Sequence, residues 1–155
     1  MTLLAARIGD RRDSAALDQA TAFLQACTQG EPRRARPLTS PEFRWFASPL
    51  SQAEWEGPEA RAFFGACRWE KLELLPQGLV ALWDPAALTA MVGAPVEADD
   101  RLCVVDVLRE ERSSLGLLIR AAPRALVVAA FDPAPLGRLL AETATVLGNL
   151  LSPGA

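Results

Sequence analysis

Acidic side chains within apolar strands are the groups in this sequence best suited to acid–base chemistry. Asp106 lies in the run Leu102–Leu108, where strand alternation puts only apolar residues on its own face and on the other. Burial there raises the pKa of an unpaired carboxyl, which suits a general acid or base, so Asp106 is the first catalytic candidate. The alternative is a structural Asp106, bonded to backbone amides, to water at a sheet edge or to an arginine. The candidate arginines are Arg44, Arg109 and Arg120.

Four other residues complete the predicted site. Asp132 is the second catalytic candidate, because it follows the apolar run Leu126–Phe131 and shares a face with part of it. A proline follows Asp132, so a helix-capping role explains it without chemistry. Trp45 and Trp83 are expected in the wall of a ligand pocket together with Arg44, although filling a core is the commoner use of tryptophan.

The residue types that are missing exclude several mechanisms. The chain has no histidine, which rules out Ser-His-Asp triads and histidine-ligated metals. Cys27, Cys67 and Cys103 are far apart and form no Cys-x-x-Cys pair, so we expect three small buried side chains. Neither a phosphate-binding glycine loop nor a dinucleotide fingerprint occurs. We therefore expect no cofactor and no metal.

Length and composition indicate one globular domain. The chain has 155 residues, 50% of them hydrophobic and 23% charged, and its net charge of −3 argues against a general nucleic-acid binder. No apolar run approaches the ~18 residues of a membrane span. The first arginines follow an apolar patch, which reverses the order of a secretory signal. We expect a cytoplasmic protein without membrane or nucleic-acid partners, with an extension at 1–13, a single domain at 14–151 and a tail at 152–155.

The first half of the chain predicts short, mixed elements. An amphipathic helix is expected over Ser14–Gln29, capped by Asp13 or Ser14 and ended by Gly30, because apolar residues recur at helical spacing. The elements expected next are an aromatic strand at 42–46, a helix at 58–67, a hairpin of strands 69–75 and 79–83, and a helix from Asp84-Pro85 to about Val92.

The last third predicts an antiparallel meander and a closing helix. Three strand-length apolar runs at 102–110, 115–120 and 125–131 are separated by short turns, and a leucine-striped helix starts at Asp132-Pro133. The fold class is therefore α+β, with N-terminal helices packed on an antiparallel sheet and a closing C-terminal helix. The residues expected in its core are Phe23, Phe63, Phe64, Trp83, Val105 and Val128.

Between Ala16 and Leu136 the chain resembles the nuclear transport factor 2-like superfamily, in particular SnoaL-like polyketide cyclases and their bacterial relatives. The segments that carry this likeness are Phe23–Gly30, Ser40–Phe46, Gly57–Phe64 and Phe131–Leu136. The resemblance implies a curved, cone-like sheet around a pocket. Enzymes of that family commonly use His, Tyr or paired Asp in the cone, and this chain has neither His nor Tyr.

A second resemblance, over Pro58–Leu151 only, is to the roadblock family of dimeric GTPase regulators. It rests on the strand Leu126–Phe131, the Asp132-Pro133 pair that ends this strand, and the closing helix. Two functions are thus expected. One is a pocket that binds a small apolar molecule, with isomerisation, cyclisation and hydrolysis as the candidate reactions; the sequence does not decide whether the protein is an enzyme. The other is a non-catalytic, roadblock-like interaction module with a protein partner. We expect a homodimer in either case, formed through the sheet or the closing helix.

Overall fold

A computed structural model describes residues 2–29, 32–49, 54, 57–108, 110–121 and 123–151, and the side chains of these except 2–10, 32–33, 49, 63 and 151. The α+β class is confirmed. The elements in chain order are α1 (Thr2–Thr28), the 3-10 helix η1 (Pro32–Leu38), β1 (Thr39–Trp45), β2 (Ser48–Pro49), α3 (Pro58–Gly65), β3 (Arg68–Leu74), α4 (Gln77–Val80), α5 (Pro85–Val92), β4 (Asp100–Leu108), β5 (Arg112–Arg120), β6 (Leu126–Phe131) and α6 (Ala134–Leu151).

The strands form one sheet in the order β2-β1-β6-β5-β4-β3. The predicted meander is confirmed, because β4, β5 and β6 pair in antiparallel fashion. The sheet as a whole is mixed, since β1 pairs with β6 in parallel. At one edge, β3 carries a bulge between Glu70 and Glu73, in which Lys71 has a φ of 53°.

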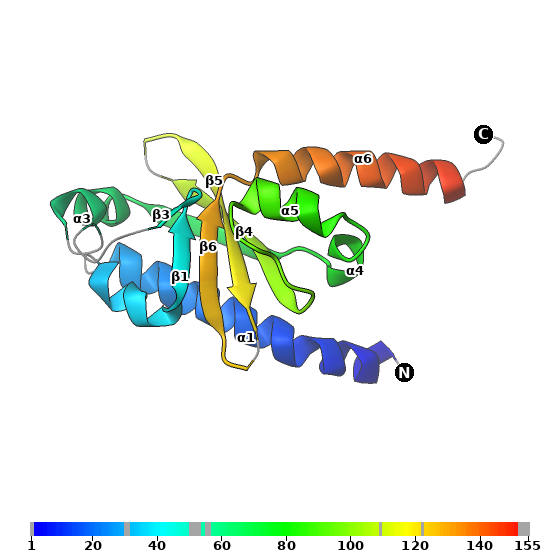
Figure 1. The fold of residues 1–155 in the computed structure, drawn as a ribbon, viewed down its shortest axis with the longest axis horizontal. Coiled ribbons are helices and arrows are strands. Elements are labelled where there is room, and N and C mark those ends of the chain that lie inside the picture. The colour runs from blue at the N-terminus through cyan, green and yellow to red at the C-terminus, as the bar shows by residue number, and fades with distance from the viewer. Residues whose placement is uncertain are drawn as a thin grey trace.

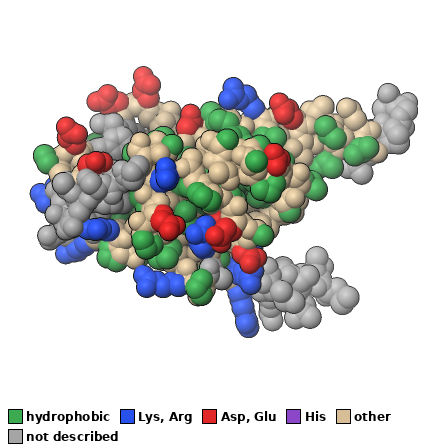
Figure 2. Space-filling model, viewed as in Figure 1, with side chains coloured by type: hydrophobic (Ala, Val, Ile, Leu, Met, Phe, Trp, Pro, Cys, Tyr) green, Lys and Arg blue, Asp and Glu red, His purple; other side chains and the backbone are tan. Residues whose placement is uncertain are grey.

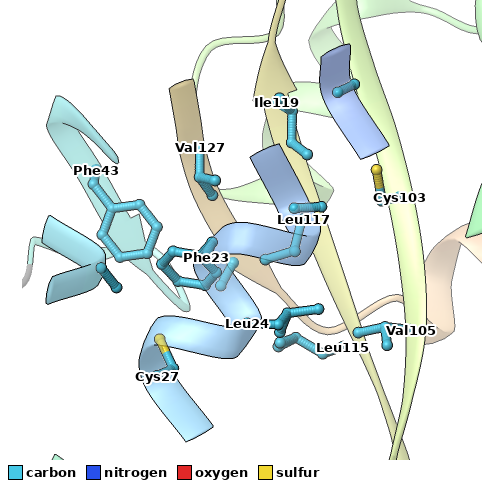
Figure 3. Packing of buried hydrophobic residues seen from close by; sticks show 14 of the residues in the cluster. Phe23, Leu24, Cys27, Phe43, Cys103, Val105, Leu115, Leu117, Ile119 and Val127 are labelled. Carbon is cyan, nitrogen blue, oxygen red and sulfur yellow. The ribbon is translucent and has the colours of Figure 1, made fainter. Parts of the chain in front are cut away.

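Helix α1 covers one face of the sheet (Figure 1). Its predicted apolar stripe is buried, and Phe23 is fully enclosed. Figure 3 shows Phe23 and Leu24 packed toward strand residues such as Leu117 and Val127, while the ring of Phe43 approaches Phe23 from β1. Phe64 brings α3 into the same cluster. This first core joins the N-terminal helix to the meander.

The opposite face is covered by α4, α5 and α6 (Figure 1). Strand alternation directs Leu102 and Leu118 to this side, whereas their neighbours Cys103 and Leu117 face α1. Trp83 and Leu136 are buried here as well. Both faces of the sheet are thus apolar, so the chain forms three layers. Of the expected core residues, Phe23, Phe64, Trp83, Val105 and Val128 are confirmed as buried.

Helix α6 leaves the body after its first half. Asp132 caps it by accepting a hydrogen bond from Ala134 N at 3.0 Å, as its sequence predicts. Leu136 is buried and Thr143 is half-buried, but Val146 and Leu150 are exposed. Figure 1 shows the end of α6 extending beyond the sheet on the same side as the start of α1.

Two predicted elements are wrong. The first helix begins at Thr2 and not at Ser14, so Asp13 is not its cap; Asp13 lies inside α1 and its Oδ1 accepts from Arg101 Nε at 2.8 Å. The predicted second hairpin strand at 79–83 is instead the helical turn α4 and its exit, with Val80 N bonded to Pro76 O. β3 pairs with β4, which therefore has a strand on both sides.

Some predictions lie outside the described residues. These concern the Gly30 cap, the side chain of Phe63, a pairing of Asp106 with Arg109, and the tail at 152–155. Among the described helices, none combines the length and the apolar character needed to cross a membrane.

Candidate functional site

Asp106 lies on the sheet face opposite α1. Its neighbours Val105 and Val107 both contribute to the α1-side core, so its own side chain points the other way, and it is half-buried. In the sheet register Asp106 stands between Glu70 of β3 and Ser114 of β5. It lines neither of the two cavities discussed below. The first catalytic candidate therefore stands on the sheet face that α4, α5 and α6 cover in part, beside a second carboxylate, that of Glu70.

The arginines expected near Asp106 have other partners. Arg44 is exposed and its Nη1 lies 3.3 Å from Ala47 O. Arg120 is paired with Asp100, through Nε to Oδ1 at 3.1 Å and Nη2 to Oδ2 at 3.2 Å. Asp132 is an exposed helix cap. The structure thus does not bring Asp106, Asp132 and Arg44 together around a cavity.

A small cavity opens at the end of the α1-side core, where α1, α3, the β1–β2 turn and the strands β3 to β5 meet. Its volume is about 90 Å³. We call it the end cavity, and its lining residues are Leu24, Thr28, Trp45, Phe46, Phe64, Cys67, Trp69, Val107, Ser113, Ser114 and Leu115. Elements far apart in the sequence therefore converge on one hollow, and the predicted pocket residue Trp45 forms part of its wall.

The sheet floor of the end cavity follows from the strand register. Trp69 of β3 is paired with Val107 of β4, and Val107 is paired with Ser113 of β5. Because Val107 faces α1, its cross-strand neighbours Trp69 and Ser113 face α1 too. An indole ring and a hydroxyl thus lie on either side of an apolar residue. Ser113 was missed by sequence reasoning, although extending the alternation of Leu115 backwards by two residues identifies its face.

Aromatic rings form the opposite wall. The Trp45 ring contacts Phe64 with centroids 5.2 Å apart at 75° and Phe46 with centroids 5.1 Å apart at 70°, both edge-to-face. Phe46 is 46% exposed, so it is the member of this wall most open to solvent. Sequence patterns did not predict this role for Phe46, because the aromatic run 42–46 indicated only a strand.

The polar groups of the end cavity are few and uncharged. None of its described lining residues carries a formal charge. Thr28 Oγ1 donates to Leu24 O at 2.9 Å, which leaves its lone pairs as acceptors. Ser113 is exposed and Cys67 is half-buried. Such a site can accept and donate single hydrogen bonds, but it offers no counter-ion to a charged ligand.

Trp83 belongs to a second cavity on the other side of the sheet. This cavity of about 240 Å³ is lined by Gln77, Val80, Ala81, Trp83, Pro85, Leu88, Val96, Glu97 and Ala98. Trp83 is buried, and its Nε1 donates to Thr143 Oγ1 at 2.9 Å, so it anchors α6. Several of the lining residues lie on the surface, and Glu97 Oε2 is paired with Arg120 at 3.3 Å. Trp45 and Trp83 thus line different cavities.

The thiols differ in their surroundings. Burial raises the pKa of Cys103 to about 12 and raises the pKa of Cys27 still further, so neither forms a thiolate at neutral pH. Cys67 lines the end cavity. Among the described residues there is no group of three or more Cys, Asp and Glu side chains that could hold a metal ion.

Comparison with known proteins identifies no relative: no family model, no curated protein and no solved structure matches this chain.

Proposed function

We propose that this protein binds a small, uncharged and largely apolar molecule in the end cavity. The observation that carries the proposal is the combination of an aromatic wall, a hydroxyl-bearing floor and a lining without charge. Pockets for small molecules are mostly apolar with a few placed polar groups, and this cavity has that composition. An acid–base reaction through Asp106 finds no support in the geometry, because Asp106 faces the other side of the sheet.

The location of the ligand can be tested with the thiol of Cys67. Cys27 and Cys103 are buried, so a small alkylating reagent such as iodoacetamide is expected to modify Cys67 first. Indole at saturating concentration is expected to slow that modification, measured by mass spectrometry over time. Ser113→Trp places a bulky ring at the lining of the end cavity and is expected to abolish the protection by indole.

The matched control is Ala98→Trp, which places the same side chain at the second cavity. It is expected to leave the protection by indole intact. If Ala98→Trp abolishes indole binding by calorimetry and Ser113→Trp does not, the ligand occupies the second cavity. If neither indole nor a panel of small neutral molecules binds, the proposed function is wrong.

A second candidate function, the dimeric interaction module, is favoured by the exposed end of α6. Val146 is 57% exposed and Leu150 is 69% exposed, and Leu82, beside the α6 anchor Trp83, is 65% exposed. Figure 2 shows hydrophobic side chains gathered along the projecting arm, while charged side chains of both signs cover the body. α6 carries no charged residue after Glu142. We propose a second copy of this chain as the occupant, because an uncharged face can pair with itself without like-charge repulsion.

Sedimentation equilibrium at micromolar concentration tests this second proposal. The full chain is expected to sediment as a dimer and the double variant Leu147→Lys/Leu150→Lys as a monomer of 16.7 kDa. Ala62→Lys, which adds a charge to the exposed side of α3, is the control and is expected to stay dimeric. A monomeric parent chain would exclude the dimer.

A further inference from the structure

We infer, on the basis of the proposed function, that the ligand of the end cavity is an uncharged aromatic molecule bearing one hydrogen-bonding group, and that Phe46 is the residue that selects it. The inference rests on three features of the described chain: the rings around the cavity, the hydroxyl groups of Ser113 and Thr28 in its lining, and the backbone of the β1–β2 turn.

The rings favour a flat aromatic ligand over an aliphatic one. Trp45 already makes edge-to-face contacts with Phe46 and Phe64, and Trp69 faces them from β3. A ligand ring placed among them gains further edge-to-face or offset contacts, which a saturated ring of the same size does not make. Aromatic pairing of this kind corresponds to about a two- to tenfold preference in affinity.

The polar groups define the other end of the ligand. Ser113 Oγ can donate or accept, and Thr28 Oγ1 is left with lone pairs only. A phenolic hydroxyl or an indole N–H can therefore donate to either oxygen. A carboxylate would leave water for a lining that offers it no cation, so charged analogues are excluded.

The volume requires one wall to move. About 90 Å³ is less than the roughly 150 Å³ of an apolar cavity that accepts benzene. Phe46 is the exposed member of the aromatic wall, so its ring can shift toward solvent and enlarge the cavity while its edge still contacts a bound ring. Phe64, by contrast, is buried in the α1-side cluster. The access of a ring-sized ligand thus depends on Phe46.

The β1–β2 turn fixes where Phe46 stands. Both central residues of this tight turn have positive φ, 50° at Phe46 and 67° at Ala47, although such positions favour glycine or asparagine. The surroundings hold the turn in place: Phe46 N donates to Ala130 O at 2.8 Å, and a Cβ added to Gly93 would lie 2.7 Å from Ala47 Cβ. Strained backbone of this kind persists only where packing enforces it, and here it directs an aromatic ring to a cavity mouth.

The test compares three ligands of similar size by isothermal titration calorimetry: phenol, cyclohexanol and benzoate. The protein is expected to bind phenol about two- to tenfold more tightly than cyclohexanol, and to show no binding of benzoate. Ser113→Ala is expected to lower the affinity for phenol by about two- to tenfold. The affinity for toluene, which has no hydroxyl, is expected to stay unchanged.

The variant that isolates Phe46 is Phe46→Ala, which is expected to lower the preference for phenol over cyclohexanol, because one of the rings that contact the ligand is lost. Its matched control is Ala47→Gly, which relieves the turn while keeping the ring and is expected to preserve that preference. If cyclohexanol binds as tightly as phenol, or if Phe46→Ala keeps the preference, this inference fails although the proposed function stands. If none of the three molecules, nor toluene or indole, binds, the proposed function itself fails.

Discussion

The most completely buried charged group among the described residues is Asp100, at the start of β4. Its side chain is 1% exposed and accepts a bidentate pair of hydrogen bonds from the Arg120 guanidinium, from Nε to Oδ1 at 3.1 Å and from Nη2 to Oδ2 at 3.2 Å. Glu97 N donates to Oδ2 as well, at 2.9 Å. Arg120 is less enclosed, with 22% of its side chain exposed and Glu97 Oε2 at 3.3 Å. The hydrogen bond to Asp100 raises the pKa of Arg120, so the guanidinium stays protonated.

This asymmetry predicts unequal losses when one partner is removed. Arg120→Met leaves a buried carboxylate with a single amide donor, and uncompensated buried charges of this kind cost about 3–5 kcal/mol. Asp100→Asn leaves the guanidinium with Glu97 and some water, so the expected loss is that of a charge-assisted hydrogen bond, about 1.5–3 kcal/mol. The arginine variant should therefore be less stable than the asparagine variant by about 1–2 kcal/mol.

Urea unfolding at pH 7, followed by tryptophan fluorescence, measures both free energies of unfolding. The control is Arg12→Met, which removes a shorter ion pair of 2.7 Å with Asp99 whose side chains are 51% and 64% exposed. Exposed pairs contribute ~0–1 kcal/mol, so this variant should stay close to the parent. The reasoning is refuted if Arg12→Met destabilises as much as Arg120→Met, because burial would then not decide the value of a pair.

Three further predictions concern packing and burial. Phe64→Ala should cost ~3–5 kcal/mol in unfolding free energy, since Phe64 is 6% exposed, and an unchanged denaturant midpoint would contradict its place in the core. Gly116→Ala should cost about 1–3 kcal/mol, because the new Cβ would lie 2.5 Å from the Phe131 ring; Gly137→Ala, with nothing within 4 Å, should not destabilise, and equal losses would refute the steric account. Burial raises the pKa of the Cys103 thiol from its ordinary value of 9.0 to about 12. Above pH 9 the unfolded chain therefore loses a proton that the folded chain keeps, so the free energy of unfolding should fall from pH 9 to 11. Cys103→Ala should make that fall shallower by ~1.4 kcal/mol per pH unit. If the free energies of unfolding of the parent and the variant fall in parallel over this pH range, burial does not raise the pKa of Cys103.

Local sequence patterns were sufficient to predict the buried face of α1 and the aspartates that cap α5 and α6. The stripe of α1 predicted which side chains are buried, and Asp84 caps α5 just as Asp132 caps α6. The predicted strand at 79–83 failed because a short apolar run fits a buried helical turn equally well. The parallel pairing of β1 with β6 joins segments too distant for any local pattern to reveal.

The site was predictable only in part for the same reason. Strand alternation places Asp106 on the opposite side of β4 from Val105 and Val107, but which side of the sheet would hold the end cavity depended on long-range packing. Trp45 lines the end cavity, whereas Trp83 lines the second cavity and serves mainly as an anchor for α6. Phe46 and Ser113 became visible only once the turn and the register were known.

The bulge in β3 has a consequence for how folded chains meet at high concentration. An exposed sheet edge can template strand addition from another molecule, and a bulge or a lysine on the edge strand discourages it. β3 has both, since Lys71, the only lysine in the sequence, stands inside its bulge with a φ of 53°. At the other edge of the described sheet, β2 is two residues long and ends in Pro49, which lacks an amide donor. We therefore expect this half-hydrophobic chain to resist amyloid-like stacking while it is folded.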